Sequence, residues 1–336
     1  MALLSACSAA ALARDLTVVV RGKTALDAVV HSIASPFTAA TRIPVQLESW
    51  DGGLGPLRSH LKAPDNTWDL VEVNAEELAA GCTEGLFEKL DWSAIGGKDH
   101  YLPQGVSDCG VGAALTTQVL AWDRDKFPAA PSWADFWDVA KYPGKRGLHR
   151  GVRGNLEFAL IADGVAPADV YKVLATSEGV DRAFRKLDQL KPYIVWWQTG
   201  AEAAHILSSG DVLMTTAPSG RIVMANRVDH RNFGIQWNAG LYRVESWAVL
   251  KGSPELRQAQ QFLYFAGMPA VEAQLLDSTG IAGLAKGAND GLTPEMQALS
   301  PTAAANLNGA VRLDTGFWHD NLAKLRQRFD TWLDGH

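Results

Sequence analysis

The chain has 336 residues, of which 47% are hydrophobic and 20% charged, and its formal net charge is −6. This length exceeds one ordinary hydrophobic core and predicts two folded units of about 150 residues each. The composition is that of a globular protein, which excludes a disordered chain, and the mixed charges contain no basic run typical of nucleic-acid binding. No stretch approaches the roughly 18 consecutive apolar residues of a membrane-spanning helix.

Residues 1–13 are small, mostly apolar and uncharged, and the first charge is Arg14. Ala11 and Ala13 fit the small-x-small pattern that a signal peptidase cuts. We interpret residues 1–13 as the remnant of a signal peptide, which predicts a periplasmic protein; an unstructured alanine-rich start is the alternative. Residues 4–7 also fit a lipoprotein cleavage box, in which Cys7 would carry a lipid anchor.

Cysteine use agrees with export. Besides Cys7 the chain holds Cys82, at the end of an expected helix, and Cys109, just before an expected strand. In an oxidising compartment such a pair is expected to form a disulfide. Closing this loop of about 27 residues would contribute about 3 kcal/mol through chain entropy. Two buried free thiols are the alternative.

The N-terminal part alternates strand and helix patterns. β-branched runs indicate strands, and apolar residues three and four apart indicate helices. Strands are expected at 16–20, 44–48 and 68–73, and helices at 25–40 and 57–61. With short connections, this alternation predicts a parallel sheet that has helices on its faces.

A long apolar stretch at 111–122 suits a strand that leaves one unit and enters another. Ser132 then caps a helix, and the alternation restarts. Strands are expected at 146–149, 193–197, 211–215 and 233–237, and helices at 156–162, 201–207 and 221–227. A second crossing strand is expected at 245–250, followed by helices at 254–265, 269–276 and 317–333.

Two sheet blocks joined by two crossing strands predict an α/β protein with two lobes, each a mainly parallel sheet flanked by helices. Each lobe is discontinuous in sequence, because the chain crosses twice. We expect lobe 1 to comprise residues 14–115 plus 247–300, and lobe 2 to comprise residues 116–246 plus 301–336. The crossing strands would serve as hinges.

No pattern in the sequence indicates an enzyme. The motifs G-x-S-x-G, H-E-x-x-H, Walker A and C-x-x-C are absent. The eight histidines are scattered and none has metal-ligand spacing. We therefore expect a non-catalytic chain with no cofactor and no metal. Of the twelve tryptophans, five lie at the ends or mouths of expected strands, where open α/β sheets bind ligands, and they are Trp50, Trp196, Trp197, Trp237 and Trp247.

A set of ordered segments carries a family resemblance. They are residues 68–74, 85–91, 142–147, 209–216, 245–252 and 260–264. Together they resemble the polyamine-type (spermidine/putrescine-binding) periplasmic solute-binding proteins of bacterial ABC importers. The resemblance implies the two-lobed periplasmic binding protein fold, a small solute in the interlobe cleft, and delivery by a monomer to the permease subunits in the membrane.

The resemblance also implies site residues. Glu245 matches a carboxylate that holds an amine, and Trp197 or Trp247 would pack on methylene groups. The other expected cleft residues follow the strands of both lobes, and they are Arg21, Trp50, Asp51, Asn74, Glu76, Arg150, Arg153, Gln198, Thr199 and Arg221.

The sequence departs from the polyamine pattern in its arginines. Arg21, Arg150, Arg153 and Arg221 would repel a diamine if they converged, because guanidinium groups bind carboxylates and phosphates. Solvated or paired arginines are the alternative. A polyamine or related amine is therefore the first expectation. An anionic or zwitterionic solute, such as an amino acid, an organic acid or a phosphonate, is the second. A sensor subunit with the same fold would look alike in sequence.

Overall fold

The computed structural model describes residues 14–335, so the expected signal-peptide remnant and Cys7 lie outside the described range. Its centre is a nine-stranded mixed sheet. The strands are β1 (Leu16–Arg21), β2 (Val45–Trp50), β3 (Leu70–Asn74), β4 (Val111–Asp123), β5 (Arg146–His149), β6 (Ile194–Trp197), β7 (Met214–Pro218), β8 (Phe233–Val249) and β9 (Val311–Arg312).

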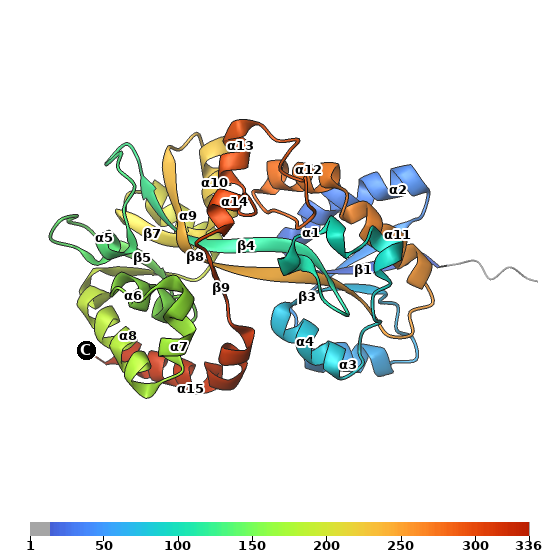
Figure 1. Cartoon of the computed structure of the whole chain (residues 1–336), viewed down its shortest axis with the longest axis horizontal. Coiled ribbons are helices and arrows are strands. Elements are labelled where there is room, and N and C mark those ends of the chain that lie inside the picture. Colours follow the sequence, from blue (N-terminus) through green and yellow to red (C-terminus); the bar gives the residue numbers. More distant parts are fainter. Residues whose placement is uncertain (1–13, 336) are drawn as a thin grey trace, which may run out of the picture.

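The strand order is β2-β1-β3-β8-β4-β7-β5-β6, with β9 beside β8. At one end β1 pairs in parallel with β2 and β3, and at the other β5 pairs in parallel with β6 and β7. The long strands β4 and β8 pair antiparallel with each other and connect the two ends (Figure 1). Their ladder shifts register between Gly112 and Ala114 and again between Gln118 and Leu120.

Helices flank both ends of the sheet (Figure 1). They are α1 (Lys23–Val29), α2 (Ser35–Thr41), α3 (Leu54–Lys62), α4 (Ala75–Thr83), α5 (Trp133–Trp137), α6 (Asn155–Ala162), α7 (Val170–Leu174), α8 (Ser177–Leu190), α9 (Gly200–Ser208), α10 (Ser219–Val228), α11 (Leu256–Ala266), α12 (Pro269–Thr279), α13 (Pro294–Leu299), α14 (Ala304–Leu307) and α15 (Thr315–Asp334). The α/β class expected from the sequence is confirmed. The strands expected in two mainly parallel sheets form one mixed sheet, because β4 and β8 pair antiparallel with each other and with strands at both ends.

Three local expectations were wrong. The strands expected at 233–237 and 245–250 are the two ends of one strand, β8, because the residues between them stay extended against β4. The strand expected at 211–215 starts only at Met214. The helix expected at 25–40 is interrupted by a π-helical segment, Val30–Ala34.

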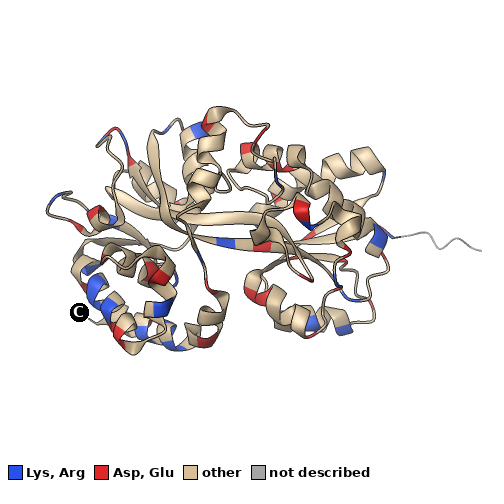
Figure 2. Ribbon diagram, viewed as in Figure 1, with Lys and Arg blue, Asp and Glu red and all other residues tan. Residues whose placement is uncertain are grey.

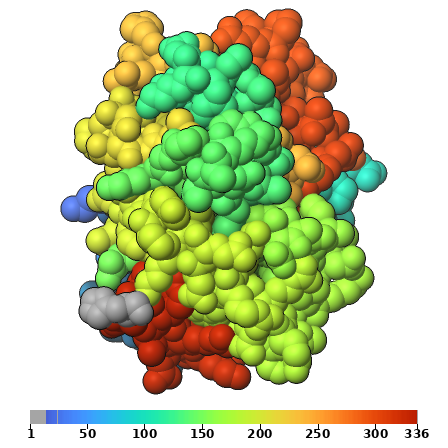
Figure 3. Space-filling model, turned by 90° about the vertical axis from the view of Figure 1, so that its left-hand side faces the viewer, coloured from blue at the N-terminus to red at the C-terminus, as the bar shows by residue number. Residues whose placement is uncertain are grey.

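Separate hydrophobic clusters lie at the two ends of the sheet. One contains Leu16, Phe37 and Phe262 from β1, α2 and α11. The other contains Trp133 and Phe158 together with residues from the last helix, α15. Figure 3 shows that helix in dark red against the yellow-green part of the chain. The C-terminal helix therefore packs with the segment around 130–190 and not with the N-terminal strands.

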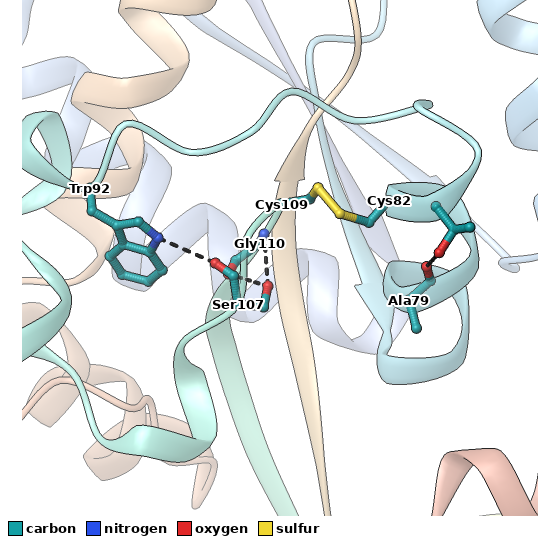
Figure 4. Close-up of a disulfide and its surroundings, with 7 residues drawn as sticks. Ala79, Cys82, Trp92, Ser107, Cys109 and Gly110 are labelled. Atoms are coloured by element: carbon teal, nitrogen blue, oxygen red, sulfur yellow. Dashed lines mark hydrogen bonds between the residues drawn. A yellow bond between two sulfur atoms is a disulfide. The ribbon is translucent and has the colours of Figure 1, made fainter.

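Cys82 and Cys109 form the expected disulfide, with a Cα–Cα distance of 5.8 Å (Figure 4). The bond connects the last turn of α4 to Cys109, two residues before β4. Beside it, Ser107 Oγ donates to Gly110 O at 2.7 Å and accepts from Gly110 N at 3.0 Å. The disulfide thus fixes α4 to the start of a strand that runs the length of the sheet.

Candidate functional site

The middle of the β4–β8 pair carries polar groups, although both strand ends are apolar. Thr116 and Gln118 are half-buried alternate residues of β4, and Thr116 lies opposite Arg243 of β8. Arg243 Nε lies 3.3 Å from Thr116 Oγ1 and 3.3 Å from Glu245 Oε1. Figure 2 shows both signs of charge adjacent on β8 between the two ends of the sheet. Strand alternation explains this, because residues two apart share one face.

Arg21, the last residue of β1, faces several carboxylates. Its backbone N–H donates to Glu72 Oε2 at 3.0 Å, and its guanidinium pairs with Glu77. Its Nε lies 3.9 Å from Glu245 Oε2, too far for a hydrogen bond. The guanidinium carbon also lies 5.6 Å from the centroid of the Trp50 ring, and the face of this ring attracts the positive charge.

Glu76 and Glu77 lie in the first turn of α4, whose N-terminus is capped by Asn74. Asn74 Oδ1 accepts from Glu77 N at 2.8 Å, and Glu77 Oε2 accepts from Asn74 N at 3.0 Å, a reciprocal capping box. Glu77 Oε1 also accepts from Gly53 N at 2.6 Å. Glu76, one position earlier, takes no part in the capping box. Its Oε1 accepts from Arg153 Nη2 at 2.7 Å.

Arg153 reaches Glu76 from the other end of the sheet, in the loop between β5 and α6. Gly154 follows it with φ of +85°, a left-handed conformation suited to glycine. Asn155 Nδ2 donates to His149 O at 2.7 Å and to Gly151 O at 2.8 Å, which fixes the loop. We call Arg21, Glu72, Glu76, Glu77, Arg153, Arg243 and Glu245 the central cluster.

Burial raises the pKa of two acids of the central cluster, Glu72 and Glu245. Burial raises the pKa of Glu72 to about 7, and the neighbouring Glu245 adds to that rise while the Arg21 backbone N–H opposes it. Burial also raises the pKa of Glu245, which Arg243 and Arg21 oppose and Glu77 and Glu76 reinforce. Two buried carboxyls that compete for ionisation favour a cationic group nearby.

Unpartnered polar atoms concentrate around the central cluster. Among residues 14–335, seven buried side-chain nitrogen or oxygen atoms have no hydrogen-bond partner. Five of them are Arg21 Nε, Gln118 Nε2, Arg153 Nε, Asn155 Oδ1 and Glu245 Oε2. Buried polar groups in folded proteins are normally satisfied by protein, water or ligand. The central cluster therefore offers unpartnered donors, including arginine nitrogens, and unpartnered acceptors, including a carboxylate oxygen, to a small polar molecule.

Several residues expected at the site lie in the hydrophobic core or have exposed side chains. Trp247 is in the hydrophobic core against Phe262, and Trp197 is in the core beneath α9. The side chains of Asp51, Arg150, Gln198, Thr199 and Arg221 are exposed, although the backbone oxygen of Asp51 accepts from Arg21 Nη1 at 3.3 Å. Thr199 caps α9 instead, through Glu202 N. The structure brings together Arg21, Trp50, Asn74, Glu76, Arg153 and Glu245.

Three cluster members were missed from the sequence. Arg243 precedes Glu245 by two residues on one strand, so the period of a strand was a usable signal. Glu72 is an acid within an apolar strand, which was a second signal. Glu77 stands three residues after Asn74, the spacing of a capping box.

Neither metal chemistry nor a membrane span is indicated in the part of the chain that the structure describes. Within residues 14–335, no three His, Cys, Asp or Glu side chains gather as ligands for a metal ion. In the same range, no helix combines the length and the hydrophobicity of a bilayer span.

Comparison with known proteins places the chain. The model of the bacterial extracellular solute-binding protein family matches residues 32–304. A gamma-aminobutyric acid (GABA)-binding protein of Pseudomonas aeruginosa is 41% identical over 328 residues, which cover 97% of this chain and 93% of the relative. The solved Atu4243–GABA receptor has a TM-score of 0.83 and 29% identity, with 96% of this chain and 98% of that chain covered.

The spermidine/putrescine-binding protein PotD of Streptococcus pneumoniae shares the fold, with a TM-score of 0.76 and 18% identity over 96% of this chain and 100% of that chain. The resemblance drawn from the sequence is thus confirmed for the fold and the general class, and the expectation of a non-catalytic protein is confirmed as well. The chain belongs to the bacterial extracellular solute-binding protein family.

Proposed function

We propose that this chain is the solute-binding subunit of an ABC importer and binds an ω-amino acid of the GABA type. The solute would lie at the central cluster, between lobe 1 (14–115 plus 247–300) and lobe 2 (116–246 plus 301–336), with β4 and β8 as hinges. The protein would act as a monomer in the periplasm and dock on the permease subunits. Relatives that bind GABA support the ligand class.

The observation that carries the proposal is the mixed set of unpartnered buried atoms. Glu245 Oε2 is a buried acceptor with no hydrogen-bond partner and suits an ammonium group. Arg153 Nε and Gln118 Nε2 are donors with none and suit a carboxylate. An ω-amino acid offers both groups, one at each end of a short alkyl chain.

The charge balance favours a zwitterion over a diamine. The central cluster contains four carboxyls and three arginines, so it carries one excess negative charge when every acid is ionised and none when Glu72 is protonated. A zwitterion leaves this balance unchanged. A diamine would add two positive charges and leave uncompensated positive charge at a partly desolvated site, which is costly.

A polyamine is the second candidate, because the excess carboxyl and the fold shared with the polyamine-binding structure favour it. A matched ligand series separates the two. GABA, putrescine and succinate share a four-carbon skeleton and differ only in having one, two or no ammonium ends. We expect GABA to raise the melting temperature most at equal concentration, without turnover. A larger shift with putrescine would reverse the assignment.

Variants test the site itself. Glu245→Gln should weaken GABA binding about 100-fold, because removing one partner of a buried charged hydrogen bond costs about 3 kcal/mol. Arg221→Ala is the control, since the Arg221 side chain is exposed and, within residues 14–335, forms no hydrogen bond or ion pair with the cluster. Titration calorimetry measures both. Loss of binding in the Arg221 variant with binding kept in the Glu245 variant would contradict the proposed site.

A further inference from the structure

Glu157 is a buried carboxylate that the ligand contacts above do not use. It lies in the first turn of α6 and is 0% exposed. Its Oε2 accepts from Gly154 N at 2.9 Å. Its Oε1 accepts from Tyr171 Oη at 2.7 Å and from Trp318 Nε1 at 2.8 Å. Within residues 14–335, no lysine, arginine or histidine forms an ion pair with it.

A carboxylate in such a place is costly for the fold. Burial raises its pKa, and the hydrogen bonds from Tyr171, Trp318 and Gly154 oppose that rise. An apolar residue or a glutamine would fill the same volume without burying an acid. The three donors come from the loop before α6, from α7 and from the C-terminal helix α15. Glu157 therefore ties three separate segments to one point.

This point leads directly to the central cluster. Trp318, which donates to Glu157, is 0% exposed, and the guanidinium carbon of Arg153 lies 5.7 Å from the centroid of its ring. Arg153 in turn pairs with Glu76. A carboxylate that accepts the indole N–H polarises the ring, which strengthens its attraction for a cation over its face. Glu157 also holds Gly154, the residue next to Arg153.

We propose that Glu157 is a positioning residue for solute capture, which holds Trp318 and the loop at Gly154 so that Arg153 faces Glu76 and the solute. This inference rests on the proposed function only in giving Arg153 a ligand. The contacts that connect Glu157 to Glu76 through Trp318 and Arg153 do not depend on the identity of the solute.

A double-mutant cycle tests the inference with GABA as the probe. Glu157→Gln preserves volume but cannot accept at both oxygens, and we expect it to weaken binding on the order of tenfold in the wild-type background. In an Arg153→Met background, the same change should leave the dissociation constant unaltered. An equal loss in both backgrounds would show a purely structural role and overturn the proposal.

Two further variants guard the interpretation. Trp318→Phe keeps an aromatic ring but removes the indole N–H, so it should reproduce part of the loss even if Glu157→Gln folds poorly. Glu272→Gln is the matched control, because Glu272 is another buried acid and accepts the backbone N–H of Ala285 at 2.6 Å, but among the described residues it forms no ion pair with Arg153 and no hydrogen bond to Trp318. It should change the melting temperature and spare binding. We call the series of contacts from Glu157 through Trp318 and Arg153 to Glu76 the relay. A binding loss in the Glu272 variant equal to that in the Glu157 variant would contradict the relay.

The relay can fail separately from the proposed function. If wild-type protein does not bind GABA, the proposed ligand is wrong, and a ligand-free cycle still tests Glu157. In that cycle, Glu157→Gln and Glu76→Gln are combined, and unfolding is followed in urea. Effects of independent residues on the unfolding constant multiply; we expect the double variant to fall short of that product by about twofold. A full product would overturn the relay.

Discussion

Two of the places where segments from opposite ends of the sheet meet differ in chemistry. In the ion-pair contact, Arg153 Nη2 lies 2.7 Å from Glu76 Oε1. In the glycine contact, Gly220 at the start of α10 packs against Gly280 after α12, so closely that a Cβ on Gly280 would lie 2.8 Å from Gly220 Cα. Figure 1 shows α10 and α12 on one side of β4 and β8, and α4 on the other.

The two contacts should resist separation to different degrees. Behind the glycine contact lies a buried apolar cluster of Val223, Leu276, Ala282 and Met296. Separating it would expose apolar surface at about 25 cal/mol per Å². Separating a partly exposed ion pair costs only about 0–1 kcal/mol, because water solvates both charges. We therefore expect the molecule to open at the ion-pair contact and to pivot at the glycine contact.

The largest expected effect comes from the disulfide that anchors α4, the helix that carries Glu76. Replacing Cys82 and Cys109 by serine should lower the free energy of unfolding by about 3.5 kcal/mol, because the unfolded chain regains the entropy of the closed loop. Urea denaturation measures the loss, and wild-type protein kept reduced serves as the control. Equal midpoints for oxidised wild type and the variant would show that α4 is anchored by packing alone.

Next in size is the glycine contact itself. Gly280→Ala should cost about 2 kcal/mol, because Gly280 has φ of +71° and its new Cβ would meet Gly220. Gly164→Ala is the matched control, since Gly164 has φ of +86° with nothing within 4 Å of a new Cβ. The difference between the two variants isolates the close approach of the backbones. Equal losses would mean that the glycine contact is not tight.

The sequence predicted the elements better than their meeting points. A run of β-branched residues identified β1, a long apolar stretch identified most of β4, and Ser132 marked the start of α5 as its N-cap. Helix α8 was overlooked, although Val180, Phe184 and Leu187 recur at helical spacing on its buried side. Patterns of period 2 and 3.6 are local, so they are visible in one chain.

The central cluster could be predicted only in part, because its pairs are distant in sequence. Arg153 and Glu76 are 77 residues apart, and Trp318 and Glu157 are 161 apart. The sequence pattern around one partner does not indicate which distant residue it will contact. The core position of Trp247 was hidden for a similar reason: a tryptophan on a crossing strand serves a core or a site equally well, and the packing of α11 decides. The site assignments themselves stay predictions until binding is measured.

The third prediction concerns pH and the acids of the central cluster. Glu72, with a pKa of about 7, lies near Glu245, Arg21 and Arg243, and the ammonium end of a bound solute would favour its ionised form. Protonation below pH 7 therefore competes with binding, and affinity should fall as pH falls. For one linked proton, the dissociation constant of GABA should rise about tenfold between pH 8 and pH 6. In Glu72→Gln this dependence should vanish; a persisting slope would assign it to another group.

The variant with the smallest expected effect on stability, Glu76→Gln, tests at which of the two contacts the molecule opens. Glu76→Gln removes a pair whose side chains are 34% and 24% exposed, so it should lower the free energy of unfolding by only about 0.5 kcal/mol. Its effect on shape should be larger than its effect on stability, because the ion pair joins the two ends of the sheet on the side expected to open. Small-angle scattering of the ligand-free variant should give a larger radius of gyration than wild type, with added GABA reducing the difference.

A matched ion pair on the other side provides the control. Arg227 of α10 and Asp277 of α12 lie 3.1 Å apart next to the glycine contact, and their side chains are 37% and 55% exposed. Asp277→Asn should therefore cost as little stability as Glu76→Gln, yet leave the radius of gyration unchanged, because the apolar cluster behind the glycine contact still holds α10 on α12. Expansion in Asp277→Asn with none in Glu76→Gln would exchange the roles of the two contacts and place the pivot beside α4.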